Sequence, residues 1–227
     1  MPIETKTCSK PISKDVVVIG NGPSAITLSY LMSGHVPYYR GNCNDEFLHT
    51  RLSENANETL VLQDLEFLAN GLEGRSSNPV SVLFDALAHP DADLNMEQPS
   101  LLEWRLREDL GVDHVVLGQG CPGGAWKQMA DTELLTVSLG TWMELPNLSM
   151  KDHVAEAVGG RVSVSTVAAY YRDYVQQMSL GGNFEENTLV TSVRKCSSMV
   201  LIFTYGRAAL ALAFIHHLKF ISGKYKI

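Results

Sequence analysis

The sequence predicts an α/β protein of the Rossmann-like class, with a mostly parallel sheet that is incomplete towards the C-terminus. Two short apolar runs, Val16–Ile19 and His114–Leu117, have the length and the β-branched content of buried strands. Each run leads into a glycine-rich segment. Strands and segments with helical spacing of apolar residues alternate to about residue 195, which is the order typical of this class.

The first glycine-rich segment has the spacing of a dinucleotide-binding corner. Gly20, Gly22 and Ala25 follow the strand in a G-x-G-x-x-A pattern, and apolar residues then recur at helical intervals until Gly34. The first glycine lets the chain turn sharply, the second lets a pyrophosphate approach the backbone, and the alanine lets helix and strand pack closely.

A helix that starts at this corner presents N–H groups and a partial positive charge to phosphates. Pro23 and Ser24 suit its first turn, where a missing or side-chain-bonded N–H costs little. The pattern predicts that residues 20–25, Asn21 included, bind a dinucleotide. The alternative is a structural tight turn without a ligand.

Residues 36–39 are the candidate second strand of the Rossmann unit, and an acidic residue that holds a ribose hydroxyl is expected after it. Asp45 and Glu46 lie near that distance, in a polar stretch that also fits a solvated loop. Asp64 or Glu66 could face a cofactor, although exposed charge on an element edge explains them as well.

Three further segments precede the second apolar run. Residues 60–68 are expected to bury Leu62, Leu65, Phe67 and Leu68. Asn78 and Pro79 predict the start of a helix that buries Val82, Leu83, Ala86 and Leu87, and residues 89–93 predict a turn rather than a metal site. Apolar residues and alternating charges predict a helix with a solvated face over residues 101–110.

The second glycine-rich segment, residues 118–129, contains four glycines and a proline within seven residues, so its backbone must adopt special turns. One interpretation is a wall of a flavin or adenine pocket, with Gly123 and Gly124 near the cofactor and Trp126 packed beside it. The other is a plain turn followed by a core tryptophan.

The remaining segments predict a strand at 134–138, an apolar loop at 139–148, a helix from Ser165 as N-cap to residue 180, and a strand at 188–193. The helix is expected to place Tyr171 and Tyr174 on one buried face, and the last strand is expected to pair with the earlier strands. Gly181 and Gly182 are expected to end that helix. The apolar stretch 199–221 is expected to be a helix packed on the body or a tail without a partner. Insertion in a membrane is disfavoured, because Arg207 near its middle would cost about 2.5–3.5 kcal/mol.

Composition narrows the class of protein. A net charge of −7 argues against a nucleic-acid partner held through phosphate contacts. Four scattered cysteines without a C-x-x-C predict neither a disulfide framework nor a zinc site, and the polar start lacks a secretory signal, so an intracellular protein is expected. The predicted organisation is a polar segment 1–14, a dinucleotide-binding Rossmann-like domain 15–195 and an apolar tail 196–227.

Four strings, VVVIGNGPSAITLSYLMSG, LEGRSSNPVSVLFDALAHPDADL, HVVLGQGCPGGAW and WMELP, together resemble the oxidative stress-induced growth inhibitor family. The similarity runs from about residue 16 to residue 193 and includes the string VAAYYRDYV at 167–175. The family in turn is similar to the flavin-dependent N-hydroxylating and flavin-containing monooxygenases, which carry an N-terminal FAD fingerprint and a later G-G-x-W element.

The resemblance implies an oxidoreductase that binds FAD, takes hydride from NADPH and transfers one oxygen atom of O₂ to an unidentified small molecule. It also implies a role in the control of cell growth, death and cytokinesis, with nuclear or mitochondrial placement. It identifies no general acid or base. The cofactor-binding residues that it implies are Gly20, Gly22, Pro23, Ser24 and Ala25 at the FAD pyrophosphate, and Gly123, Gly124 and Trp126 at the flavin.

The sequence departs from the family in two places. Residues 41–52 differ from the usual pattern, and the match stops near Lys195, whereas relatives continue for hundreds of residues. A C-terminally truncated form is therefore expected, in which the FAD/NAD(P)-binding domain 15–195 is incomplete and the apolar tail 196–227 is divergent. Such a form is expected to retain flavin at most and to have no turnover. The alternative is a regulatory protein that keeps the flavin-domain shape without catalysis and binds protein partners through its apolar tail.

Overall fold

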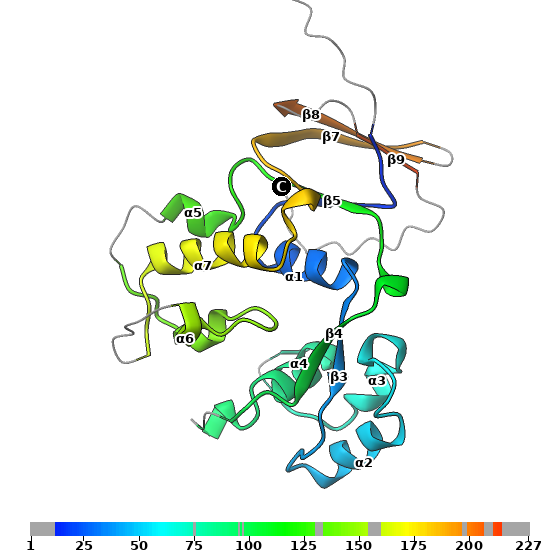
Figure 1. The fold of residues 1–227 in the computed structure, drawn as a ribbon, viewed down its shortest axis with the longest axis vertical. Helices are drawn as coiled ribbons and strands as arrows, with labels where there is room; N and C mark the ends of the chain where they lie inside the picture. The colour runs from blue at the N-terminus through cyan, green and yellow to red at the C-terminus, as the bar shows by residue number, and fades with distance from the viewer. Residues whose placement is uncertain are drawn as a thin grey trace, which may run out of the picture. The chain divides into compact units, whose positions relative to one another are not determined.

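The computed structural model describes residues 12–74, 76–94, 96, 98–129, 134–153, 160–196, 199–206 and 211–214. The chain forms two compact units: unit 1 contains residues 1–33 and 111–227, and unit 2 contains residues 34–110. Both can be followed in Figure 1.

A parallel sheet with a helix after its first strand forms the centre of unit 1. Strands β2 (Val16–Ile19), β5 (His114–Leu117) and β6 (Phe184–Glu185) lie in the order β2-β5-β6, and every pair is parallel. Helix α1 (Pro23–Met32) follows β2 after the glycine corner. This βαβ arrangement confirms the predicted α/β class and the Rossmann-like parallel sheet.

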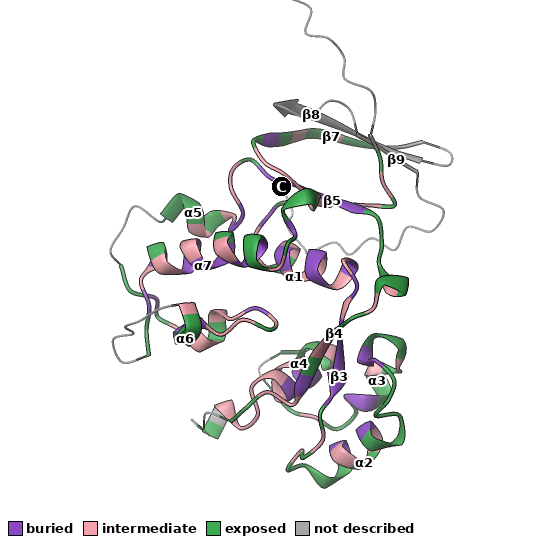
Figure 2. Ribbon diagram, in the orientation of Figure 1, coloured by how far each residue is buried: buried purple, intermediate pink, exposed green. Residues whose placement is uncertain are grey.

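The two predicted buried strands differ in burial. All four residues of β5 are buried, as expected, whereas those of β2 are half-buried and Ile19 is 54% exposed (Figure 2). The prediction of full burial for β2 was wrong because this strand lies at the edge of the sheet.

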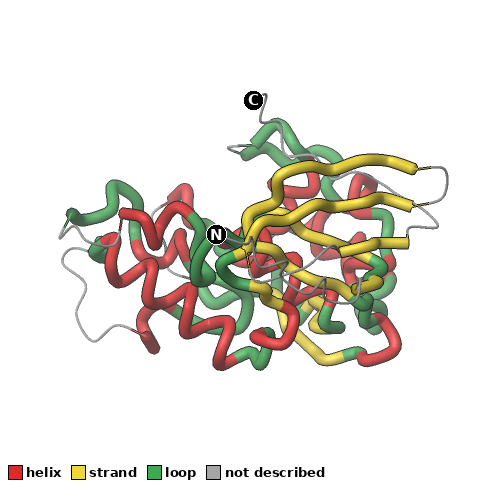
Figure 3. Tube along the Cα trace, turned by 90° about the horizontal axis from the view of Figure 1, so that it is seen from above, coloured by secondary structure: helices red, strands yellow, loops and turns green. Residues whose placement is uncertain are grey.

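A second sheet in unit 1 joins the two ends of the chain. Its strands are β1 (Ile12–Ser13), β7 (Thr188–Cys196), β8 (Met199–Gly206) and β9 (Ala211–Phe214). They lie in the order β1-β9-β8-β7; β7 and β9 are antiparallel to β8, and β1 is parallel to β9. Figure 1 labels β7, β8 and β9, and Figure 3 draws the strands of the structure as yellow tubes.

This sheet corrects two predictions. The predicted strand at 188–193 is present, but it pairs with β8 and not with an earlier strand. The prediction of a helix within 199–221 was wrong, because strands β8 and β9 form there. The run M-V-L-I-F-T-Y of β8 is rich in β-branched and aromatic residues, which favour a strand. Residues 207–210 and 215–221 of that prediction lie outside the described part of the chain.

Helix α7 (Val164–Gln177) is the longest helix among the described residues. Its N-cap is Ser163, whose side chain accepts a hydrogen bond from the Thr166 N–H, so the prediction of Ser165 was wrong by two residues. The helix ends before Gly181 and Gly182, which lie in a 3₁₀ turn.

The other short elements of unit 1 surround α7. They are α5 (Ala125–Met129), α6 (Met150–His153) and 3₁₀ turns at Gly140–Met143 and Gly181–Asn183. The strand predicted at 134–138 was wrong: it is reduced to a single bridge between Leu135 and Ser163, and Val137 is 89% exposed. The run has a neighbour in residues 162–164: the Thr136 N–H donates to the Val162 carbonyl at 2.8 Å and the Val164 N–H donates to the Leu134 carbonyl at 2.9 Å. Helix α7 begins at Val164, so this pairing stays too short for a strand.

Unit 2 is a two-stranded antiparallel sheet covered by helices. Its strands are β3 (His35–Tyr39) and β4 (Leu102–Leu106), and its helices are α2 (Glu46–Glu54), α3 (Leu65–Leu68) and α4 (Pro79–Ala88). Its 3₁₀ turns are Leu60–Leu62, Ala92–Leu94 and Glu108–Leu110.

Strand β3 confirms the strand predicted at 36–39, but it pairs with β4 and not with the parallel sheet, so its role as the second Rossmann strand was wrong. Strand β4 occupies the centre of the helix predicted at 101–110. The run L-E-W-R-L-R alternates apolar and charged residues with period two, which a strand satisfies and a helix does not.

The core of unit 2 partly follows the prediction. Asn78 caps α4 through the Ser81 N–H, Pro79 begins it, and Val82, Leu83 and Leu87 are buried as expected. The core also contains Tyr39, Leu48, Leu52, Leu60, Leu68, Ala69 and Leu102. Leu62 and Phe67 are 54% and 52% exposed, so their predicted burial was wrong: short 3₁₀ and α turns break the register of the segment.

Among the described residues, no helix combines the length and the hydropathy that a membrane crossing requires.

Candidate functional site

The glycine corner at the end of β2 has the backbone geometry that its sequence predicts. Gly20 has a φ of +98°, a conformation that side chains disfavour, and its N–H donates to the Leu117 carbonyl at 2.8 Å. Gly22 is extended and precedes Pro23, the first residue of α1. The chain therefore turns from the edge strand into the helix within three residues.

Open space lies beside both glycines of the corner. A Cβ atom on Gly20 or on Gly22 would meet no atom within 4 Å among the described residues. The first turn of α1 contains no acidic residue, and Gly22 offers no side-chain cap to its N–H groups. A helix N-terminus of this kind attracts anions, and this one has room for them.

The second glycine-rich segment, residues 118–129, lies directly against the corner. The Gly123 N–H donates to the Asn21 carbonyl at 2.9 Å, and the Asn21 side-chain amide donates to the Gly120 carbonyl at 2.7 Å. A Cβ on Gly124, whose φ is +57°, would lie 2.9 Å from Gly22 Cα. The structure thus brings residues 20–25 and residues 123–124, which are a hundred positions apart, into one place.

Trp126 lies just beyond this contact, in helix α5. Its ring is half-buried and packs edge-on against Tyr171 of α7, with ring centroids 6.4 Å apart. A Cβ on Gly123 would lie 3.6 Å from the Tyr171 Cβ. Tyr171 therefore supports both the turn and the aromatic ring that the sequence predicts beside a flavin.

Three tyrosines of α7 hold the loop that follows Trp142. The Tyr170 hydroxyl donates to the Leu148 carbonyl and accepts from the Leu145 N–H, both at 2.7 Å. The hydroxyls of Tyr171 and Tyr174 donate to the carbonyls of Met143 at 3.2 Å and Pro146 at 2.8 Å. All three rings are buried.

Sequence reasoning missed these contacts, although it placed Tyr171 and Tyr174 on the buried face of the helix. The signal was three tyrosines in the string YYRDY, because a buried tyrosine needs a partner for its hydroxyl. Burial raises the pKa of Tyr171 to about 12 and raises the pKa values of Tyr170 and Tyr174 above the usual range. They stay neutral at physiological pH and act as hydrogen-bonding supports.

The acidic residues considered as ribose or cofactor ligands have structural roles in unit 2. Asp45 caps α2 by accepting from the Leu48 N–H at 3.0 Å, so Glu46 lies in a helix and the predicted loop was wrong there. Asp64 caps α3 through the Phe67 N–H. Glu66 lies in the first turn of α3.

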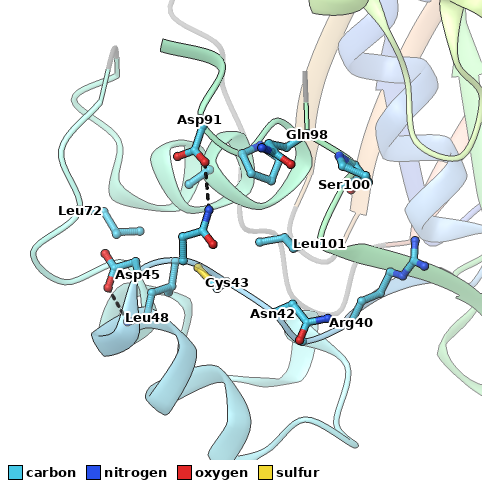
Figure 4. Close-up of a pocket in the computed structure, with 15 residues that line it drawn as sticks. Arg40, Asn42, Cys43, Asp45, Leu48, Leu72, Asp91, Gln98, Ser100 and Leu101 are labelled. Atoms are coloured by element: carbon cyan, nitrogen blue, oxygen red, sulfur yellow. Dashed lines mark hydrogen bonds between the residues drawn. The ribbon is translucent and has the colours of Figure 1, made fainter. Parts of the chain in front are cut away.

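Unit 2 also contains a pocket of about 480 Å³ (Figure 4). Asp45, Asp91 and Cys43 line it, together with the apolar side chains of Leu48, Leu72 and Leu101. The Asn44 amide donates to Asp91, and burial raises the pKa of the Cys43 thiol, which disfavours a reactive thiolate. Among the described residues, no group of three His, Cys, Asp or Glu side chains has the arrangement of a metal site.

Comparison with curated proteins gives clear relatives. The chain is 47% identical over 204 residues to human oxidative stress-induced growth inhibitor 2, a match that covers 86% of the chain and 40% of that protein. It is 43% identical over 189 residues to mouse oxidative stress-induced growth inhibitor 1, covering 81% of the chain and 39% of that protein. The chain belongs to the oxidative stress-induced growth inhibitor family.

The family assignment confirms the resemblance drawn from the four strings. The chain spans about two fifths of the length of the curated relatives that it matches. A Caenorhabditis elegans homologue of the family is 33% identical over 201 residues. No family model matches the chain.

Solved structures with a similar arrangement of helices and strands share less sequence identity with the chain than these relatives do. A flavin-containing monooxygenase from Stenotrophomonas maltophilia is 19% identical, with a TM-score of 0.47, and the match covers 89% of the chain and 36% of that structure. A bacillithiol disulfide reductase from Staphylococcus aureus is 10% identical, with a TM-score of 0.46 and the same two coverages.

Proposed function

We propose that the chain binds FAD at the corner formed by residues 20–25 and 118–129, as the dinucleotide-binding part of an NADPH-dependent flavin monooxygenase. One observation carries the proposal: two glycine-rich segments meet at the N-terminus of α1, and the Cβ positions of Gly20 and Gly22 face open space. The similarity of the growth inhibitor family to flavin-containing monooxygenases supports the same cofactor.

The residues of the corner fit the pyrophosphate of FAD. Gly20 and Gly22 leave the backbone accessible, and the N–H groups that follow Pro23 in the first turn of α1 could donate to a bound anion. Ser24 is exposed at the start of the helix, where its hydroxyl can add a hydrogen bond. Half-buried Ala25 keeps this turn of the helix narrow.

The residues of the second segment fit the flavin end. The missing side chains of Gly123 and Gly124 let this segment pack against Tyr171 and Gly22, and Trp126 adds a large, half-buried aromatic ring beside them. The Tyr171 hydroxyl donates to the Met143 carbonyl in the loop after Trp142, and this hydrogen bond fixes the Tyr171 ring in place. When bound, FAD supplies the hydride and oxygen chemistry, while these residues orient it and limit the access of water.

The activity of the whole protein is part of the same proposal. The resemblance of the family supports NADPH as reductant, O₂ as oxidant and a role in the control of cell growth. It identifies no general acid or base. A regulatory protein that binds FAD without turnover is the second candidate. The two candidates differ in NADPH consumption.

Two measurements on the purified chain test the proposal. Titration with FAD should perturb the visible flavin spectrum and reach saturation. NADPH oxidation in air, compared with free FAD at equal concentration, then separates the enzyme from the binding protein. Absence of any FAD binding would contradict both candidates, while saturable binding without excess NADPH oxidation would leave the regulatory one.

A further inference from the structure

Asn21 differs from the other residues of the corner, because its side chain does not face the open space. The residue is 5% exposed, and its amide donates to the Gly120 carbonyl at 2.7 Å. A Cβ on Gly118 would overlap the same amide. The side chain is therefore enclosed by the second glycine-rich segment.

The backbone of Asn21 makes a second link to that segment. Its carbonyl accepts a hydrogen bond from the Gly123 N–H at 2.9 Å. Gly123 directly precedes Gly124 and lies two positions before Ala125, where α5 begins. Gly123 in turn lies against Tyr171, which contacts Trp126. A continuous series of contacts runs from the pyrophosphate end of the proposed site to its flavin end.

We infer that Asn21 is a positioning residue that couples the two ends of the FAD site: it holds residues 118–126 in the conformation that the flavin requires, without touching the cofactor. The inference rests on the proposed function. The pyrophosphate end is built from β2 and α1, which keep their own hydrogen bonds without the Asn21 amide. Loss of the amide therefore loosens the flavin end alone.

The coupling predicts different effects on two ligands of the chain. ADP reaches only the pyrophosphate end, whereas FAD reaches both. Asn21→Ala removes the buried donor to Gly120, and the loss of such a hydrogen bond is expected to weaken FAD binding about tenfold. ADP affinity should change by less than about twofold.

A spectroscopic signature accompanies the loss of affinity. Aromatic rings in contact with a flavin quench its fluorescence, and Trp126 is the ring that the second segment carries. FAD bound to Asn21→Ala should therefore be brighter than FAD bound to the unaltered chain. A purely structural defect would lower the fraction of folded protein without changing the brightness of the FAD that is bound.

Asn183→Ala is the matched control. The Asn183 amide also makes one side-chain hydrogen bond in unit 1, to Ser33 at 3.2 Å, and it lies outside both glycine-rich segments. FAD affinity, ADP affinity and bound-flavin brightness should all equal those of the unaltered chain.

A second pair of variants tests the contact without relying on Asn21→Ala. Gly118→Ala should weaken FAD binding, because its Cβ overlaps the Asn21 amide, and Asn21→Gly in the same chain should relieve the overlap. FAD affinity of the double variant should exceed that of Gly118→Ala. Additive losses would show that the two positions are not coupled.

The outcomes separate the inference from the proposed function. If the unaltered chain binds neither ADP nor FAD, the proposed function is wrong and the inference falls with it. If it binds both and Asn21→Ala leaves FAD affinity and brightness unchanged, or lowers ADP and FAD affinity equally, the coupling is wrong while the FAD site stands.

Discussion

At the scale of single residues, the corner depends on glycines that have different tasks. Gly20 adopts a left-handed backbone, Gly22 leaves open space for a ligand, and Gly124 allows two segments to touch. The sequence predicted the first two tasks from spacing alone. It could not predict the third, because the spacing of a motif carries no information about which distant segment packs against it.

Gly22→Val is expected to abolish FAD binding, since the new side chain would occupy the space assigned to the pyrophosphate. Titration of the variant with FAD measures this. Gly181→Val is the control, because the Cβ of Gly181 also meets no atom within 4 Å and the residue lies in a 3₁₀ turn away from the corner. Equal FAD affinity in both variants would exclude Gly22 from the site.

Gly124→Ala is expected to lower the free energy of unfolding by about 1–3 kcal/mol, because it combines a left-handed backbone with a contact against Gly22. Gly120→Ala lies in the same segment, and its Cβ would meet no atom within 4 Å. Urea denaturation should show a much smaller loss for Gly120→Ala. Equal losses would contradict the close approach of the two segments.

At the scale of elements, the sequence predicted β2, α1, β5 and α4 with nearly correct bounds, because each has strong local signals. Strand β4 was missed because its charged residues masked a period of two. The pairing of β3 with β4 depends on contacts between segments more than 60 residues apart, which no local pattern reports.

The start of α7 offers a test of capping. Ser163→Ala removes the acceptor for the Thr166 N–H and is expected to lower the free energy of unfolding by about 1 kcal/mol. Ser165→Ala, at the position that the sequence suggested, keeps that acceptor and should cost much less. Thermal unfolding of the two variants compares them, and a larger loss for Ser165→Ala would contradict the cap.

Because the tyrosines of α7 are buried, we expect the folded protein to lose stability at alkaline pH. Burial raises the pKa of Tyr171 to about 12, above its value in an unfolded chain of about 10. A raised pKa favours the protonated form in the folded state, so this stability is fully present below about pH 10 and is lost as the pH rises towards 12. Denaturation at pH 8 to 11.5 should show the decline.

Tyr171→Phe keeps the ring and removes the titrating hydroxyl, so its stability should decline less steeply over the same range. The variant also loses the hydrogen bond to Met143, which lowers its stability at pH 8. Parallel pH curves for the variant and the unaltered chain would show that Tyr171 does not contribute.

At the scale of the whole molecule, the second sheet of unit 1 is built from both ends of the chain, and the proposed site is built from the parallel sheet. The sequence predicted that residues 20–25 form the turn between β2 and α1, because such a corner is a local motif. Their role in binding a cofactor stays a prediction. It did not predict the second sheet, because parallel pairing of β1 with β9 joins residues about 200 positions apart.

Removal of residues 196–227 tests whether the proposed FAD site is independent of the second sheet of unit 1. The deletion removes β8 and β9 and leaves the edge of β7 without its strand partner, which favours self-association. FAD affinity should stay within about threefold, because β2, β5 and α1 keep their own pairing. Sedimentation and FAD titration measure the two effects, and loss of FAD binding would place the tail within the site.

The central claim is that the corner between β2 and α1 receives the pyrophosphate of an adenine cofactor. Amide chemical shifts of the ¹⁵N-labelled chain during titration with ADP test it most directly. We predict that the largest changes fall on the N–H groups of Gly22, Ser24 and Ala25. Changes confined to unit 2, or no saturable change at all, would contradict the claim.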